Sequence, residues 1–274
     1  GATARYVAKW NPATAAWTNI GSLMEFSVKS IVFDRSNTLY AAGISDGQPS
    51  SGNTNMWNIA KWNGSIWTNL GSGLKADSWD GVYAMAHDGT NLYVGGDFTN
   101  AGGVANTPRI ARWNGSAWSA LGTGVTGDYN AVVSTLALTT NGHLHAGGYF
   151  ERAGGVAGTT NYAKWTGAAW QPAVSNGGYF FSSLKTLTPM GSDMLVGGNF
   201  QSPFSRLGKI VNYQLSPLGE GMNGSVGALA WDGVNGHLYA GGSLSWAGAS
   251  NANNIARWNG TSWSPILEGV SNGV

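Results

Sequence analysis

The sequence contains no cysteine, few charged residues and no long apolar run, and each absence excludes a class of protein. Without cysteine there are no disulfides, no thiolate metal ligands and no thiol nucleophile. Charged residues make up 10% of the chain, and 14 Lys and Arg nearly balance 13 Asp and Glu. Without a clustered basic stripe, nucleic acid is not expected as a partner. No stretch of about 18 apolar residues is present that could span a membrane.

Residues that usually carry catalysis are also scarce. The sequence has no G-x-S-x-G elbow, and its few histidines and glutamates are scattered along the chain. Asp34, Asp88 and Asp232 each follow an apolar run, where aspartate is suited to a turn. The segments "DGTN" and "DGVNG" lack the further carboxylates of a calcium loop. We therefore predict no enzyme, no metal and no cofactor, although a glycosidase built on two distant carboxylates stays open as an alternative.

Glycine (43 residues) and tryptophan (14 residues) are abundant, and both belong to a repeat. The segment "RIARWNGSAW" at residue 109 has five further copies, which begin at residues 6, 58, 161, 209 and 254. Their first aromatic residues are Trp10, Trp62, Trp113, Trp165, Tyr213 and Trp258. A period near 50 residues is typical of propellers and solenoids.

A second signature lies between these copies, as in "NLYVGG" at 91 and "HLHAGG" at 143, and occurs five times. An apolar run precedes it and carries a small residue at one shared position, namely Ser30, Ala84, Thr135, Thr186 and Ala228. Each period therefore predicts four short strands: A, the apolar run; B, which ends in the glycines; C, "IARW"; and D, from the second tryptophan. No segment has a sustained 3.6-residue period, so we predict an all-β chain without helices.

The Asn-Gly between strands C and D predicts a hairpin with a type I′ turn. The spacing of the two aromatic positions places both on one face of the hairpin, including Tyr213 and Leu218 in the fifth copy. We interpret ten tryptophans as packing between neighbouring sheets: Trp10, Trp17, Trp62, Trp67, Trp113, Trp118, Trp165, Trp170, Trp258 and Trp263. The alternative is that these tryptophans are platforms on which sugar rings stack. The basic residue before the first tryptophan, such as Lys164, lies on the opposite face, either over the next repeat's aromatic residue or in solvent.

The double glycine, the aromatic residue in strand C and the tryptophan opening strand D together resemble kelch-type repeats. The added "AGG" after strand B and the "IARWNG" form are closer to the repeats of Rax2-like and bacterial cell-surface propellers. This resemblance implies a β-propeller of four-stranded blades over residues 1–274, as a single domain. It does not carry over the copper chemistry of galactose oxidase, which needs a cysteine.

The repeat count predicts five full blades plus one C–D hairpin, and six blades when completed. The missing A–B pair has three explanations: the chain is a fragment of a longer protein, another copy donates the strands, or five blades close without them. The chain begins without methionine, which favours a removed leader and an extracellular or cell-surface location.

Five aromatic residues fall in the B–C and D–A loops, which emerge on one face of a blade: Trp57, Trp79, Tyr129, Tyr179 and Trp246. Aromatic side chains there suit a protein partner or the apolar face of a sugar, unless they pack on their own blade. The sequence therefore predicts a non-enzymatic binding or scaffold module that uses this face. A dedicated glycan-binding lectin and an assembly subunit completed by other copies of itself are the alternatives.

Overall fold

The computed structural model describes residues 6–21, 26–45, 58–75, 81–175, 182–201 and 205–270. Across these ranges the regular structure consists of β-strands, and the model shows no helix that could cross a membrane. The chain divides into two compact units, Gly1–Gly124 and Val125–Val274. The single domain predicted from the repeats stays a prediction.

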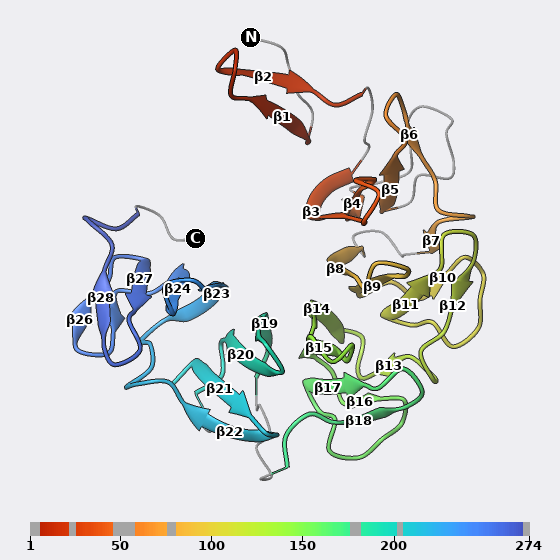
Figure 1. Cartoon of the computed structure of the whole chain (residues 1–274). Coiled ribbons are helices and arrows are strands. Elements are labelled where there is room, and N and C mark those ends of the chain that lie inside the picture. The colour runs from red at the N-terminus through yellow and green to blue at the C-terminus, as the bar shows by residue number, and fades with distance from the viewer. Residues whose placement is uncertain are drawn as a thin grey trace. The chain divides into compact units, whose positions relative to one another are not determined.

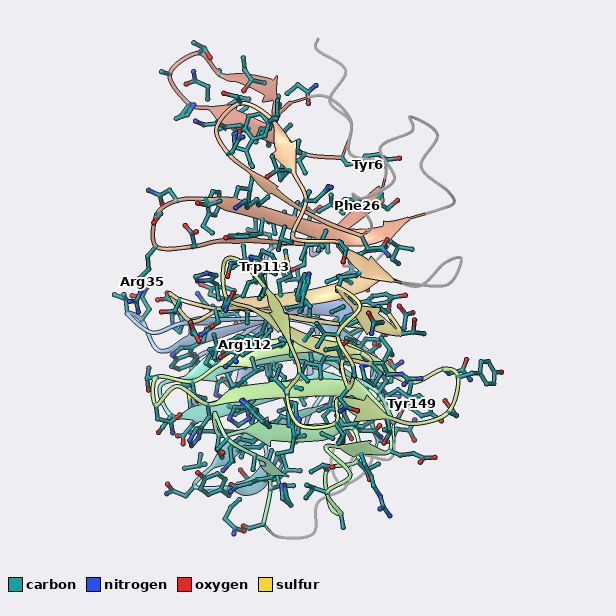
Figure 2. All side chains as sticks on the ribbon, turned by 90° about the vertical axis from the view of Figure 1, so that its right-hand side faces the viewer. Tyr6, Phe26, Arg35, Arg112, Trp113 and Tyr149 are labelled. Carbon is teal, nitrogen blue, oxygen red and sulfur yellow. The ribbon has the colours of Figure 1, made fainter. Side chains whose placement is uncertain are left out.

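The first unit contains two four-stranded antiparallel sheets and a separate hairpin (Figure 1). The hairpin consists of β1 (Ala8–Asn11) and β2 (Ala16–Asn19). The first sheet consists of β3 (Phe26–Phe33), β4 (Leu39–Ser45), β5 (Ile59–Trp62) and β6 (Trp67–Thr68). The second sheet consists of β8 (Val82–His87), β9 (Leu92–Gly96), β11 (Ile110–Trp113) and β12 (Trp118–Ser119). Arg35 lies at the turn end of the β3–β4 pair and Phe26 at the other end (Figure 2).

The second unit contains three such sheets side by side, with β19 in contact with both β14 and β23 (Figure 1). The first sheet consists of β14 (Val132–Leu138), β15 (Leu144–Tyr149), β17 (Tyr162–Trp165) and β18 (Trp170–Pro172). The next consists of β19 (Leu184–Met190), β20 (Asp193–Gly198), β21 (Leu207–Val211) and β22 (Gln214–Pro217). The last consists of β23 (Ser225–Asp232), β24 (His237–Ser243), β27 (Ile255–Trp258) and β28 (Trp263–Pro265). Five blades in A–B–C–D order and one half blade in the described residues confirm the predicted all-β propeller fold.

Every strand A contains a β-bulge immediately before the small residue that the sequence repeats. The bulge brings a strand A carbonyl against the last glycine of strand B, so that a Cβ on Gly148 would overlap the carbonyl oxygen of Val132. The same crowding occurs in all five blades, at Gly43, Gly96, Gly148, Gly198 and Gly242. This glycine is therefore required because of close backbone approach, the usual reason for glycine inside a strand.

The paired tryptophans are direct cross-strand neighbours, with ring centroids 5.2 to 5.4 Å apart. Each pair within the sheets also reaches the preceding repeat. Trp118 Nε1 donates a hydrogen bond to the carbonyl oxygen of Leu70 at 2.9 Å, and Trp113 lies over Gly71. Glycine at this place, four residues after the second tryptophan, leaves room for the next repeat's indole rings. The tryptophan pairs within the four-stranded sheets thus fill the space between successive sheets, whereas Trp10 and Trp17 of the β1–β2 hairpin, which were predicted to do the same, are 44% and 63% exposed.

The predicted register of the fifth C–D hairpin is wrong by three residues. Ile210, not Tyr213, pairs with strand B in the place of the first tryptophan, and Leu215 takes the place of the second. Lys209 is then the basic residue of strand C, so all six copies carry one there. Val174 replaces the preceding glycine and packs against the cluster that contains Ile210 and Leu215. Val174, which is larger than glycine, thus packs against Ile210 and Leu215, which are smaller than the tryptophans at the same places in the other repeats.

The predicted type I′ turn is also wrong for the Asn-Gly copies. Trp62 pairs with Trp67, which leaves a four-residue loop with a positive φ at Gly64 but not at Asn63. Asn63 Oδ1 accepts hydrogen bonds from the backbone N–H groups of Ser65 and Ile66, so its side chain organises the loop. Only the fifth hairpin has two successive positive φ angles, 49° at Asn212 and 63° at Tyr213, as a type I′ turn requires.

Candidate functional site

In each unit a D–A loop pairs with the B–C loop of the following blade through short strands. In the first unit β7 (Leu74–Lys75) pairs with β10 (Asn100–Ala101). In the second unit β13 (Val125–Thr126) pairs with β16 (Arg152–Ala153). The B–C loop of the last blade contains its own pair, β25 (Trp246–Ala247) and β26 (Ser250–Asn251). We call the surface of these B–C and D–A loops the loop face.

The structure describes two of the five aromatic residues predicted to bind a ligand. Trp57, Trp79 and Tyr179 lie outside the described residues. Tyr129 lies in the D–A loop before β14 with 91% of its surface exposed, and Trp246 opens β25 with 48% exposed. These two residues belong to different blades, so within the described chain they form two separate exposed aromatic positions.

Tyr129 projects from an anchored loop. The Asp128 carboxylate accepts a hydrogen bond from the backbone N–H of Asn130 at 2.9 Å and one from the Tyr149 hydroxyl at 3.4 Å. Tyr149 ends β15 and is itself 42% exposed (Figure 2). The sequence analysis did not include Tyr149, although its position directly after the double glycine marks it as a loop-face residue. The Asp128 carboxylate thus supplies a hydrogen-bond acceptor directly before Tyr129 in the chain and within hydrogen-bond reach of the Tyr149 hydroxyl.

Trp246 is held through its backbone. Asn223, in the preceding D–A loop, accepts hydrogen bonds at its Oδ1 from the N–H groups of Ser245 (3.1 Å) and Trp246 (2.8 Å). Its Nδ2 donates to Ser245 Oγ at 3.0 Å. The loop is therefore fixed by backbone bonds while the indole ring stays half exposed, an arrangement that lowers the entropy cost of binding.

The opposite ends of the blades carry the A–B and C–D turns, and the aspartates there act as predicted. Asp88 accepts hydrogen bonds from the backbone of Thr90 and Asn91 and from the Tyr93 hydroxyl at 2.9 Å. Burial alone would raise the pKa of Asp88, but these donors outweigh it and hold the pKa below its usual value. The carboxylate thus organises a turn. The described residues contain no group of three or more His, Asp or Glu side chains that could hold a metal ion.

We expect the buried His145 to make the stability of the fold depend on pH. Its Nδ1 lies 2.7 Å from the Tyr162 hydroxyl, and burial, helped by Lys164 and His143, lowers the pKa of His145 to about 3. Between pH 6.5 and 3 the unfolded chain binds a proton at this residue that the native state does not. The free energy of unfolding should therefore fall as the pH drops below 6.5, by about 1.4 kcal/mol per pH unit from this group.

Denaturant titrations at pH 7 and pH 4.5 check this prediction. The variant His145→Tyr is the control, because Tyr40, Tyr93 and Tyr239 occupy the same position in strand B of three other blades. It should lose less stability on acidification than the wild type. Equal losses in the two proteins would show that His145 does not set the pH dependence.

Comparison with protein-family models and with curated protein sequences gives no match. Among solved structures, the chain is similar to the computationally designed Ika8 protein, with a TM-score of 0.57 and 16% identity over 95% of this chain and 68% of that one. It also aligns with the GH74 enzyme of Niastella koreensis (TM-score 0.49, 15% identity, 88% of this chain and 37% of that one). The extracellular domain of the BT4673 system of B. thetaiotaomicron gives a TM-score of 0.48 and 14% identity over 90% and 35% of the chains. The chain spans about a third of the length of these two natural proteins, and the likeness to Ika8 concerns the fold alone.

Proposed function

We propose that this chain is a non-enzymatic, kelch-like binding module of the cell surface or extracellular space, and that its loop face contacts a protein or a glycan. The observation that carries the proposal is the pair of exposed aromatic side chains on anchored loops. Tyr129 and Trp246 are exposed, while backbone N–H groups beside them donate hydrogen bonds to the side chains of Asp128 and Asn223. Rigid aromatic groups with nearby polar groups are typical of binding hot spots.

A lectin is the more specific candidate, because each aromatic residue has amide, hydroxyl or carboxylate groups close by. Sugar rings present apolar C–H faces that stack on aromatic rings and hydroxyl groups that need hydrogen-bond partners. At Trp246 these partners are Asn223 and Ser245, and at Tyr129 they are Asp128 and the Tyr149 hydroxyl.

A glycan array tests this candidate. We expect the wild-type protein to bind at least one glycan, and Tyr129→Ala or Trp246→Ala to weaken that binding at least tenfold, which corresponds to about 1.4 kcal/mol. Thermal stability should not change, because neither ring is buried. Phe33→Ala is the control, since Phe33 is 57% exposed at the turn end of β3 and should bind as the wild type does.

If no glycan binds, the lectin hypothesis is wrong, and the proposed ligand of the loop face is then a protein. If a glycan binds and both variants bind it as the wild type does, these two aromatic positions are not the site.

A further inference from the structure

A pocket of about 150 Å³ lies at the turn end of the second unit, away from the loop face. It is enclosed by the sheet β14–β15–β17–β18 and the following sheet β19–β20–β21–β22. Lys164 comes from β17, Asp193 and Met194 from β20, and Ile210 and Tyr213 from the β21–β22 hairpin. The pocket thus combines one cation and one acid with the apolar side chains of Met194 and Ile210, and its other polar lining residues are Asn141, His143, His145, Ser192 and Asn212.

Lys164 is the unusual member of this lining. Only 5% of the residue is exposed, and its Nζ lies 3.8 Å from the centroid of the Tyr213 ring. Among the described residues, no carboxylate lies within ion-pair distance of the ammonium group and none accepts a hydrogen bond from it. A buried charge normally has a paired partner, because removing it from water is costly. The Tyr213 ring offsets part of this cost, and Lys164 lines the pocket, where water or a ligand can accept its N–H bonds.

Other blades carry a carboxylate near the strand C cation that the Lys164 blade lacks. In the second sheet of the first unit, Arg112 pairs across the strands with Tyr93, whose hydroxyl bonds to Asp88. The corresponding cross-strand pair in the pocket is Lys164 and His145. Thr139 stands in the place of Asp88, at the end of strand A, and its N–H makes the equivalent turn bond to His143. The blade with this buried cation therefore lacks the carboxylate that three other blades have at this place, namely Asp34, Asp88 and Asp232, and the β19–β22 blade, which has Met190 there, lacks it too.

We propose that this pocket binds a small, singly charged carboxylate, whose carboxyl group pairs with Lys164 Nζ. One cation matches one negative charge, and Asp193 in the lining disfavours a dianion. His145 stays neutral at physiological pH, because its pKa is about 3, and so adds no second positive charge. Tyr213, Met194 and Ile210 supply an apolar wall for the rest of the molecule. A cavity near 150 Å³ is large enough for a single six-membered ring.

The first unit provides an internal comparison. Its equivalent pocket, between the β3–β6 and β8–β12 sheets, has a volume of about 130 Å³. There Asp34 is present, Tyr40 takes the place of His145, and Arg35 donates a hydrogen bond to the Asp88 carbonyl oxygen at 3.4 Å. Since this pocket keeps its own acid, the proposal concerns the second unit alone.

Isothermal titration calorimetry with sodium benzoate and sodium acetate tests the proposal on the intact chain. We expect saturable binding of at least one of them to the wild type, and at least tenfold weaker binding to Lys164→Met. Lys61→Met is the matched control, because Lys61 has the same strand C position beside Tyr40, and it should bind as the wild type does. Benzamide and acetamide, the neutral isosteres, should bind at least tenfold more weakly than the acids.

A second variant tests the charge argument in the opposite direction. Asp193→Asn removes the acid from the lining and should tighten carboxylate binding severalfold, so the proposal does not depend on the folding of Lys164→Met. The proposal is wrong if neither acid shows saturable binding below about 10 mM. It is also wrong if Lys164→Met and Lys61→Met bind equally well, if the neutral isosteres bind as tightly as the acids, or if Asp193→Asn leaves the affinity unchanged.

Discussion

Gly148→Ala is expected to destabilise the protein by on the order of 3 kcal/mol, a large part of the 5–15 kcal/mol that stabilises a typical domain. The new methyl group would overlap the carbonyl oxygen of Val132 and approach the backbone nitrogen of Ser134. Both atoms belong to the bulged backbone of β14, where no side-chain rotation can relieve the overlap. The sheet must therefore shift, and the bonds between β14 and β15 must weaken.

Chemical denaturation of Gly148→Ala measures this loss, with Gly233→Ala as the matched control. Gly233 has no positive φ, and its Cβ would meet only ordinary contacts with the Trp231 ring, the nearest at 3.4 Å. That substitution should be neutral or stabilise by about 0.4–1 kcal/mol, because alanine restricts the unfolded chain. A Gly148→Ala variant as stable as Gly233→Ala would contradict the role assigned to the bulge.

Trp118→Ala should destabilise the first unit by about 3–5 kcal/mol, the usual cost of truncating a buried tryptophan. Trp118 is 6% exposed, and its ring fills the space between Trp113, Gly71 and Gly102. Its loss also removes the Nε1 hydrogen bond to the buried carbonyl of Leu70. The cost therefore combines a cavity with an acceptor that has lost its donor.

Trp17→Ala is the control for this prediction, because Trp17 has the same repeat position but is 63% exposed in the β1–β2 hairpin. Its replacement should cost less than about 1 kcal/mol. Denaturant midpoints of the two variants give the comparison. Equal losses would mean that repeat position, rather than burial against a preceding repeat, determines the contribution of these tryptophans.

The blade pattern was predictable because the small residue, the glycine and the tryptophan recur at fixed places in each period. The bulge was not, since its extra residue is present in strand A of every period and shows only in the pairing register. The fifth hairpin was misaligned because Tyr213 is aromatic and was matched to tryptophan. Lys209 was the better guide, since the basic residue recurs in every copy while Ile210 and Leu215 replace the aromatic pair.

Some features of the candidate sites were also predictable from the sequence, and others were not. Exposure of Tyr129 and Trp246 follows from their places in loops. For the strand C cation the sequence left two alternatives open, and Lys164 lies over an aromatic ring of the next repeat, Tyr213, although this tyrosine belongs to the turn and not to the tryptophan position. The pocket around Lys164 was not predictable, because it depends on a turn of the following blade. The replacement of aspartate by Thr139 is visible in the sequence, but its meaning depends on the burial of Lys164.

The matched sizes on the two sides of each space between sheets limit how blades can be exchanged by recombination. A second copy of the β14–β18 blade inserted directly after the first would bring Trp165 and Trp170 against Val174, where Ile210 and Leu215 now pack. Leu267 lies four residues after Trp263, as Val174 does after Trp170. A blade packed against Leu267 would therefore also need residues smaller than a tryptophan pair. The β14–β18 blade can therefore be duplicated only together with the neighbour that fits it, whereas a duplicate of the β8–β12 blade would bring its tryptophans against Gly122, a glycine like Gly71.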